Sequence, residues 1–282
     1  MGSTVHERGA TAVWDVASPA RPSRLGGVTM AGFHIPDGGL AEVGLRVVPH
    51  PAVMLILEFG ADQPVVHAAG RQQRGSLLAG PGLGSGGAVW ARGASVDCVQ
   101  VRLSPVVAHA VLGVSPADLD GVVVAVDDLW GRDLARICER LDTLSSWEER
   151  FALTDALLAG RCAERSFVDP EVAWAWRRIV AGRGLVRVDG LAAEVGWSRK
   201  RLWSRFQAQI GLPPKRAARL VRFDHAVHRL VAGDGPAGVA ADCGYTDQSH
   251  LHRDVVAFTG VTPTAVVGEP WLTIDDTAWP RG

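Results

Sequence analysis

The 282-residue sequence predicts an α+β protein with a small N-terminal β-barrel or sandwich, a helical hairpin and an all-α C-terminal domain. Two observations support this prediction. Residues 28–103 contain short strand-like runs that are separated by turns rich in Gly, Pro and Asp. Leu191 to Pro263 contains two helix-turn-helix signals joined by one long helical stretch. The length is suited to two domains.

The N-terminal part begins with residues 1–25, which show no clear strand or helix pattern and are expected to be weakly ordered, with Trp14 packing on the first domain. The strand-like runs that follow have the length and residue types of short β-strands. They are Val28–Ile35, Ala41–Val48, Val53–Phe59, Val65–Ala69 and Ser95–Leu103. Several short strands at this spacing indicate a barrel or a sandwich.

A glycine-rich stretch at 80–87 contains a literal Gly-x-Gly-x-x-Gly at Gly82, Gly84 and Gly87. A dinucleotide site requires a helix that opens at such a motif, so that backbone amides and the helix dipole meet the pyrophosphate. The residues that follow do not have a convincing helical pattern. We therefore interpret this stretch as a hairpin loop.

Two helices are expected next. Asp128 is expected to cap the first, in which Leu134, Ile137, Leu141 and Leu144 recur at helical spacing. Ser146 to Glu149 is a capping box that opens the second. The apolar stripe of this hairpin has two interpretations, self-association or simple cover for the barrel. Asp169-Pro170 is expected to start a further helix.

The two helix-turn-helix signals share one pattern. Leu191 to Ser198 is followed by a helix from Arg199, and Val239 to Ser249 is followed by a helix that includes His250 to Arg253. In each, a glycine ends the first helix where a positive φ is needed. Ser198 is expected to cap one second helix, and Thr246 or Asp247 the other.

The connector between the two signals, Pro213 to Ala232, has about 19 helical residues and a length of about 28 Å. One turn of duplex DNA is about 34 Å. A rigid connector of this size could present both second helices to one face of DNA.

The charge is unevenly distributed along the chain. Residues 1–169 have 14 basic and 19 acidic residues, a balance of −5, whereas residues 170–268 have 14 basic and 8 acidic, a balance of +6. The basic excess thus coincides with the helix-turn-helix signals, as phosphate binding requires. By itself this charge would indicate no more than a solvated surface.

The remaining composition argues against several kinds of site. Cys98, Cys138, Cys162 and Cys243 have no paired spacing, which argues against zinc or a disulfide framework and favours a reducing cytoplasm. His34, His50 and His67 are scattered, with no His-x-His pair, so no metal or other cofactor is expected. No apolar run approaches a membrane span, and no catalytic arrangement stands out.

The region from about Pro170 to Gly268 resembles the DNA-binding domain of the AraC/XylS family of transcription regulators. The resemblance rests on the Leu-Ala-Ala…Gly-Trp-Ser…Leu…Phe run from Leu191 to Phe206, on Gly211, Pro213, Arg222 and Ala226, and on Gly244-Tyr245, Asp247, Ser249, Leu251, Arg253, Gly260 and Thr262-Pro263. Three departures mean that base preference cannot be carried over. Ser204 and Val255-Val256 stand where the family usually has a basic residue and Phe-Lys, and Trp203 is large for a position that faces DNA.

The resemblance implies a division of the chain. Many members carry a small cupin-like effector domain in front, and dimer contacts often come from helices packed on it. The segment from Val101 to Gly131 is also similar to front domains with a strand, a Pro-started helix and then Asp-Asp-Leu-Trp-Gly. We expect an effector-binding barrel at 1–127, a possible dimerisation hairpin at 128–166, the DNA-binding domain at 167–268 and a tail at 269–282.

The residues expected to contact DNA lie on the outer faces of the two second helices. They are Arg199, Lys200, Arg201, Trp203, Ser204, Arg205, Gln207, Gln248, Ser249, His250, His252 and Arg253. By match to the family motif, Lys200, Trp203 and Ser204 read bases, whereas the flanking arginines suit phosphates. Trp203 has the alternative of being buried. Candidate lining residues for an effector pocket are His34, Met54, Glu58, Arg71, Trp90 and Arg102.

These expectations combine into a cytoplasmic, sequence-specific DNA-binding transcription regulator, without a cofactor, controlled by a small molecule in the N-terminal domain. Its expected partners are promoter DNA, a second copy of the chain, and RNA polymerase if it is an activator. Two alternatives remain open. The protein could bind DNA without a small-molecule effector, under control of a protein partner or of its abundance, or the barrel could be a metal-dependent cupin-type enzyme.

Overall fold

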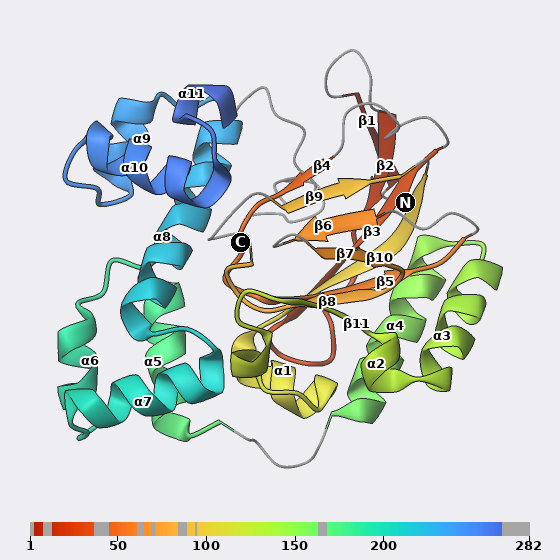
Figure 1. Cartoon of the computed structure of the whole chain (residues 1–282), viewed down its shortest axis with the longest axis horizontal. Helices are drawn as coiled ribbons and strands as arrows, with labels where there is room; N and C mark the ends of the chain where they lie inside the picture. Colours follow the sequence, from red (N-terminus) through yellow and green to blue (C-terminus); the bar gives the residue numbers. More distant parts are fainter. Residues whose placement is uncertain are drawn as a thin grey trace.

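The computed structural model describes residues 3–7, 13–36, 45–60, 65–68, 71–83, 89–93, 95–162 and 168–266. A strand-rich N-terminal half lies beside a helical C-terminal half, as Figure 1 shows. The predicted α+β class is confirmed.

The described strands form two antiparallel sheets. One has the order β1-β2-β3-β10-β5-β8-β11 and the other β4-β9-β6-β7, and no hydrogen-bonded ring closes across the part of the chain that is described. The strands are β1 (Ser3–Glu7), β2 (Val13–Ala17), β3 (Val28–Ile35), β4 (Leu45–Val47), β5 (Val53–Glu58), β6 (Val65–Ala68), β7 (Arg71–Arg74), β8 (Leu77–Ala79), β9 (Val89–Arg92), β10 (Val96–Leu103) and β11 (Val123–Ala125).

Each of the five predicted runs contains a strand, but the expectation for residues 1–25 is wrong. β1 pairs with β2, and β2 pairs with β3 through partners such as Val16 and Phe33. Val16 is fully buried, so pairing with the neighbouring strands β1 and β3 stabilises this segment. The side chain of Trp14 lies outside the described residues. At the glycine-rich stretch, Val89–Arg92 is a strand and not a helix, which agrees with the hairpin interpretation, although residues 84–88 are not described.

The central strand β10 is buried on both faces. Cys98 and Gln100 face the interior between the sheets, in a core with Phe33, Met54 and Leu77. The alternate residues Val99, Val101 and Leu103 face a second core that is shared with the helices of the N-terminal half. A strand covered on both sides shows little alternation between apolar and polar residues.

Helices cover the outer face of the larger sheet. They are α1 (Pro105–Leu112), the 3₁₀ helix η1 (Pro116–Leu119), α2 (Asp127–Trp130), α3 (Arg132–Thr143) and α4 (Trp147–Arg161). The capping box is present, since Ser146 accepts a hydrogen bond from the Glu149 amide and the Glu149 side chain accepts one from the Ser146 amide.

The expected cap at Asp128 is wrong. Asp128 lies inside the short helix α2, and Gly131, with φ of +52°, separates this helix from α3. The stripe of the α3–α4 hairpin, with Leu134, Leu141, Phe151 and Leu158, is buried in the core beneath the sheet. Covering the barrel therefore accounts for the stripe, and a dimer contact would have to use the outer face of the hairpin.

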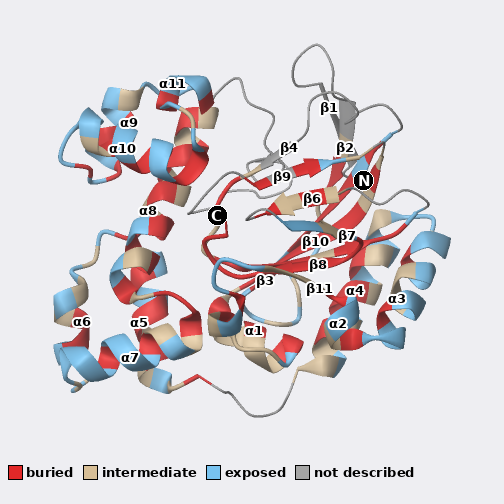
Figure 2. Ribbon diagram, viewed as in Figure 1, coloured by how far each residue is buried: buried red, intermediate tan, exposed pale blue. Residues whose placement is uncertain are grey.

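The C-terminal half is helical throughout its described part. Its helices are α5 (Pro170–Ala181), α6 (Val188–Glu194), α7 (Arg199–Ile210), α8 (Pro214–Val231), α9 (Pro236–Asp242), α10 (Gln248–Thr259) and α11 (Pro263–Val266). The connector α8 has 18 residues, which corresponds to about 27 Å. Figure 2 shows that it is buried along much of its length, with a helix-turn-helix unit at each end.

The two halves are in direct contact. Val48 and Val106 of the barrel region pack into the core of the helical half. Ser115, at the start of η1, donates a hydrogen bond to the Ala208 carbonyl oxygen of α7 at 3.2 Å. Arg216 of α8 forms an ion pair with Asp120 at 3.5 Å. The expected boundary near residue 167 falls in 163–167, which lie outside the described residues, as does the tail 269–282.

A glycine sets how closely α4 approaches the sheet. Gly32 of β3 lies under the Trp147 ring, and an added Cβ would overlap that ring. We predict that Gly32→Ala lowers the free energy of unfolding by about 1–3 kcal/mol through overpacking, measured by urea denaturation. Gly160→Ala is the matched control on α4, where a Cβ meets nothing within 4 Å, and it should be neutral or stabilising by up to about 1 kcal/mol. Equal effects of the two substitutions would contradict the packing described here.

Candidate nucleic-acid interface

Each helix-turn-helix unit is built from a short helix, a glycine turn and a longer capped helix. The turns contain Gly196 and Gly244, with φ of +69° and +67°. Ser198 accepts a hydrogen bond from the Arg201 amide at 3.2 Å. Asp247, rather than Thr246, caps α10, since its carboxylate accepts one from the His250 amide at 2.7 Å. The predicted caps therefore fix where both second helices begin.

The second helices are anchored by their buried faces. Leu202, Phe206 and Ile210 of α7 are at most 2% exposed, as predicted, and Leu251 of α10 is fully buried. The opposite face of each helix is thereby directed to solvent, which leaves it free to enter a DNA groove.

Each unit carries a surface groove in the same place. The grooves lie between the first helix, the outer face of the second, and the N-terminus of the helix that follows, and they measure about 280 and 360 Å³. The first is lined by Val188, Asp189, Ala192, Arg199, Leu202, Trp203, Pro214 and Lys215. The second is lined by Pro236, Gln248, Ser249, His252, Arg253, Pro263 and Thr264. Helix N-termini favour phosphate, because unpaired amides and the helix dipole attract anions.

The predicted base-reading residues of α7 are on the surface. Lys200 and Ser204 are exposed, Gln207 is half-buried, and the side of the helix that includes Arg199 and Trp203 borders the first groove. Trp203 is 51% exposed. The alternative in which Trp203 is buried is therefore wrong. The exposed ring can contact a thymine methyl group or a sugar.

Two arginines that were expected to meet phosphates have partners within the protein. The Arg201 guanidinium lies 4.2 Å from the centroid of the Trp197 ring. Arg205 donates two hydrogen bonds to the Asp169 carboxylate, at 2.7 and 2.9 Å, and these bonds lower the pKa of Asp169. Arg205 therefore ties α7 to the start of α5, and contact with a phosphate would compete with this pair.

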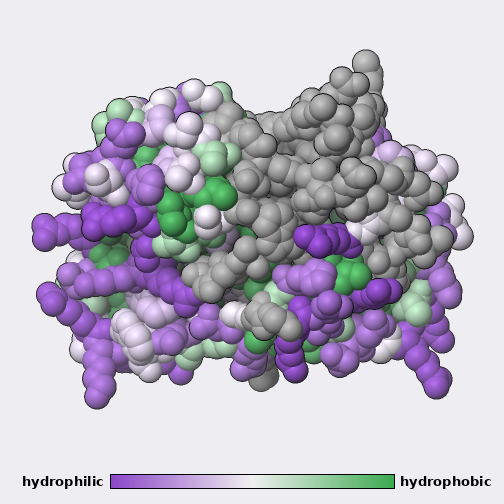
Figure 3. All heavy atoms as spheres, turned by 45° about the horizontal axis from the view of Figure 1, so that its top comes forward, coloured by the Kyte–Doolittle hydropathy of each residue, from purple (hydrophilic) through white to green (hydrophobic). Residues whose placement is uncertain are grey.

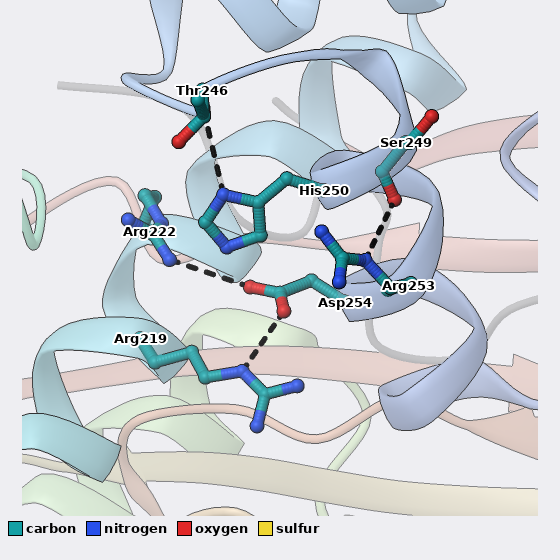
Figure 4. A network of polar contacts seen from close by, with 7 residues as sticks. All are labelled: Arg219, Arg222, Thr246, Ser249, His250, Arg253 and Asp254. Atoms are coloured by element: carbon teal, nitrogen blue, oxygen red, sulfur yellow. Dashed lines mark hydrogen bonds and ion pairs between the residues drawn. The ribbon is translucent and has the colours of Figure 1, made fainter.

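On α10, four of the five predicted residues are exposed, namely Gln248, Ser249, His252 and Arg253. His250 is half-buried and turned back against its own turn, as Figure 4 shows. Its Nδ1 accepts a hydrogen bond from the Thr246 amide at 3.5 Å, and its ring meets that of Tyr245 edge-on at 5.1 Å. We infer that His250 holds the turn in place instead of reading a base.

A buried acid that the sequence reasoning missed attaches α10 to α8. Asp254 is 3% exposed and accepts hydrogen bonds from Arg219 at 3.0 Å and Arg222 at 3.5 Å (Figure 4). The Arg222 guanidinium also lies 4.5 Å from the centroid of the Tyr245 ring. The signal in the sequence was an acid three residues after buried Leu251 in a chain whose connector is rich in arginine. Lys215, which lines the first groove, was missed as well.

Figure 3 shows hydrophilic side chains, in purple, gathered on the helical half at the left of the view. This surface belongs to the part of the chain with the +6 charge balance. A polar and basic surface is what phosphate contacts require.

The residues predicted for an effector pocket do not converge. Met54 and Glu58 line an apolar cavity of about 60 Å³ between the sheets. Arg102 instead borders a cleft of about 680 Å³ between the barrel and the helical half. His34 is exposed and lies 2.8 Å from an Asp97 carboxylate oxygen, and Arg71 is exposed on β7. Trp90 belongs to β9, and its side chain lies outside the described residues.

Ionisable groups line the contact between the barrel and α8. Asp224 of α8 lies 3.6 Å from His50 Nε2 of the barrel region and 3.9 Å from His228 Nε2. Burial is the main cause that lowers the pKa of His50, raises that of Asp224 and lowers that of Arg102 to about 9. His50 lines both the small cavity and the cleft, so it connects the two spaces.

Neither a metal site nor a membrane-spanning helix is found in the described part of the chain. No group of three or more His, Cys, Asp or Glu side chains is arranged there to hold a metal ion. None of the helices described above is long and apolar enough to cross a membrane.

The helix-turn-helix units match a known protein family. The model of a helix-turn-helix domain family matches residues 191–268, which span α6 to α11. Residues 191–268 are an AraC-type helix-turn-helix domain. The resemblance seen in the sequence is confirmed for this region, which contains the whole lining of the second groove and all of the first except Val188 and Asp189.

Three regulators are among the solved structures that the chain matches. The C-terminal domain of AraT, a response regulator from Geobacillus stearothermophilus, is 18% identical and covers 36% of this chain and 87% of its own, with a TM-score of 0.34. ToxT from Vibrio cholerae O395 is 8% identical and covers 86% and 97%, with a TM-score of 0.47. The AraC-like transcriptional activator CuxR is 15% identical and covers 69% and 80%, with a TM-score of 0.27. A search of curated proteins found no match.

The buried acid on α10 leads to a stability prediction. Asp254→Asn should lower the free energy of unfolding by roughly 2 kcal/mol, because it weakens charge-assisted hydrogen bonds to two arginines. The measurement is urea unfolding followed by tryptophan fluorescence. Asp242→Asn is the control, since Asp242 pairs with Arg229 but is 61% exposed, and its effect should be much smaller. An effect of Asp254→Asn no larger than that of the control would contradict the assigned role.

Proposed function

We propose that this protein is a sequence-specific DNA-binding transcription regulator whose N-terminal barrel binds a small-molecule effector. The match of residues 191–268 to the helix-turn-helix family is the observation that carries the DNA-binding part. The two similar grooves with exposed polar and basic residues support it. The same proposal places the protein in the cytoplasm.

In the proposed complex, α7 and α10 enter the major groove at successive turns of one DNA face. The length of α8, about 27 Å, is of the order of one helical turn of duplex. Lys200, Trp203 and Ser204 are proposed to read bases on one side, and Gln248 is suited to adenine on the other. Arg199 and Arg253 are proposed to contact phosphates.

The effector is proposed to act through the barrel cavity. His50 lines this cavity and also lies against Asp224 of α8, the helix that holds both helix-turn-helix units. A ligand that favours one placement of His50 would shift the balance between arrangements of the two halves. Two protomers would then fit or miss paired half-sites, with contacts to RNA polymerase if the protein is an activator.

DNA binding predicts a specific effect of salt. Arg199→Ala should weaken binding to the DNA upstream of its own gene and reduce the slope of log affinity against log salt by about 1. A fluorescence anisotropy titration over a salt series measures both quantities.

Arg136→Ala on α3, whose side chain is 77% exposed, is the control for charge alone and should leave the slope unchanged. Arg205→Ala should also leave the slope unchanged, because its guanidinium is engaged by Asp169. Unaltered affinity and slope for Arg199→Ala would contradict the proposed interface.

Filling the cavity tests the proposal that the barrel binds a small-molecule effector there. Ala79 lines it from β8, and Ala79→Val adds two methyl groups there. A metabolite panel should contain a compound that raises the Tm of the wild-type protein and changes its DNA affinity. Ala79→Val should reduce the affinity for that compound at least about tenfold, a loss of about 1.4 kcal/mol, while DNA binding without the compound persists. Ala156→Val, on the exposed side of α4, is the control. A ligand response that Ala79→Val leaves unchanged would place the effector elsewhere, and no response to any compound would favour the regulator without an effector.

A further inference from the structure

Two buried acceptor groups in the barrel cavity have no donor within the described residues. Glu58 of β5 is 6% exposed and Gln100 of β10 is 3% exposed, and both line the cavity. Glu58 Oε2 and Gln100 Oε1 lack a hydrogen-bond partner in the described part of the chain. A buried acceptor without a donor is unfavourable. These atoms are therefore open to hydrogen bonds from a group bound in the cavity.

The register of the sheet places the two acceptors together. β5 and β10 are antiparallel, with Cys98 opposite Glu58 and Gln100 opposite Ile56. Residues two apart in a strand lie on the same face, so Glu58 and Gln100 are diagonal neighbours on the wall of the cavity. The remaining wall is apolar, with Leu77 and Val96 among its residues. A ligand in this space would meet a pair of acceptors at one end of an otherwise apolar surface.

The surroundings of Glu58 supply no cation in the described residues. Burial raises the pKa of Glu58 to about 8. Cys98 on β10 and Cys138 on α3 have raised pKa values, and His50, ahead of β5, has a lowered one, in each case chiefly because of burial, so all three are neutral near pH 7. Arg102 is the nearest described arginine along β10, and it interacts with Asp224 at the contact with α8. Glu58 is therefore mostly protonated near pH 7. A ligand with a positive charge favours its ionised form, whereas an anionic ligand disfavours that form and gains no charge-assisted hydrogen bond from it.

We propose that the barrel cavity binds a small organic ammonium compound whose head group donates hydrogen bonds to Glu58 and Gln100 and whose apolar part contacts the surrounding aliphatic side chains. An ammonium group has three donors and one positive charge. Its hydrogen bonds to a carboxylate are charge-assisted and stronger than neutral ones. The inference rests on the proposed function only in identifying this ligand with the effector; the binding site itself does not depend on DNA binding.

Three probes of one size test the inference by isothermal titration calorimetry on the full chain. They are n-butylamine, 1-butanol and butyrate. The amine should bind at least about tenfold more tightly than the alcohol, and butyrate should not bind. Near pH 6.5 the amine should also release about one proton, because its cation displaces the proton of Glu58. At pH 9.5, where Glu58 is already ionised, the release should approach zero. Comparing heats in two buffers with different ionisation enthalpies measures it.

Two variants and one control test whether Glu58 and Gln100 bind the amine. Glu58→Gln should abolish both the preference for the amine and the proton release, and it should fold at least as stably as wild type, because it removes a buried acid. Met54→Leu is the matched control, since Met54 lines the same cavity but offers no acceptor, and it should keep both properties. Gln100→Leu should weaken amine binding without removing the proton release.

The outcomes separate this inference from the proposed function. Equal binding of amine and alcohol, or amine binding that Glu58→Gln leaves unchanged, would overturn the inference. A ligand of another chemical class that changes DNA affinity and depends on Ala79 would also overturn it, and the proposed regulator would stand. Amine binding that requires Glu58, in a protein that binds no specific DNA, would support the inference and contradict the proposed function.

Discussion

Helix α8 is the element on which both helix-turn-helix units and the contact with the barrel depend. Its apolar stripe is buried along its length, including Ala217, Leu220 and Phe223, which anchors the helices at both of its ends. The Asp254 pair with Arg219 and Arg222 fixes α10 on the same helix, and Asp224 meets His50 of the barrel region. One helix therefore sets the spacing of the two helix-turn-helix units and receives the contact from the N-terminal half. A shift of α8 relative to the barrel would move both grooves, because both helix-turn-helix units pack directly on α8.

Strand β10 has a similarly central position in the barrel, and its two faces have different surroundings. The outer face, with Val99 and Val101, packs against helices and stabilises the domain. The inner face carries Cys98, Gln100 and Arg102 in succession, from the cavity to the contact with α8. Buried polar groups weaken a core unless they are satisfied. Their presence on a strand that is covered on both faces is understandable if one end binds a ligand and the other end contacts the helical half.

The sequence predicted the C-terminal domain well because its determinants are local. Glycine turns, caps such as Ser198 and Asp247, and the i to i+4 pair Leu202 and Phe206 act within a few residues. The barrel was predicted less completely, since strands such as β8 and β10 pair with partners far away in the chain. The same distinction applies to the site. Helical periodicity predicted Trp203 on the outer face of its helix but left burial open, and the structure decided for exposure. The ion pair between Arg205 and Asp169 joins residues 36 apart and was not predicted. Pocket residues were the least predictable, because convergence in a cavity depends on sheet register.

A hydroxyl-radical and methylation-interference footprint tests directly whether α7 and α10 bind one DNA duplex together. It uses the full-length protein and the DNA upstream of its own gene. The account predicts that each protomer protects two major-groove segments about 10 base pairs apart on one face of the duplex. Methylation of guanine N7, which lies in the major groove, should also weaken binding in either segment. Protection of one segment only would contradict the simultaneous use of α7 and α10 across α8. Salt-sensitive binding without any footprint would mean that the domain offers a basic surface and does not read sequence.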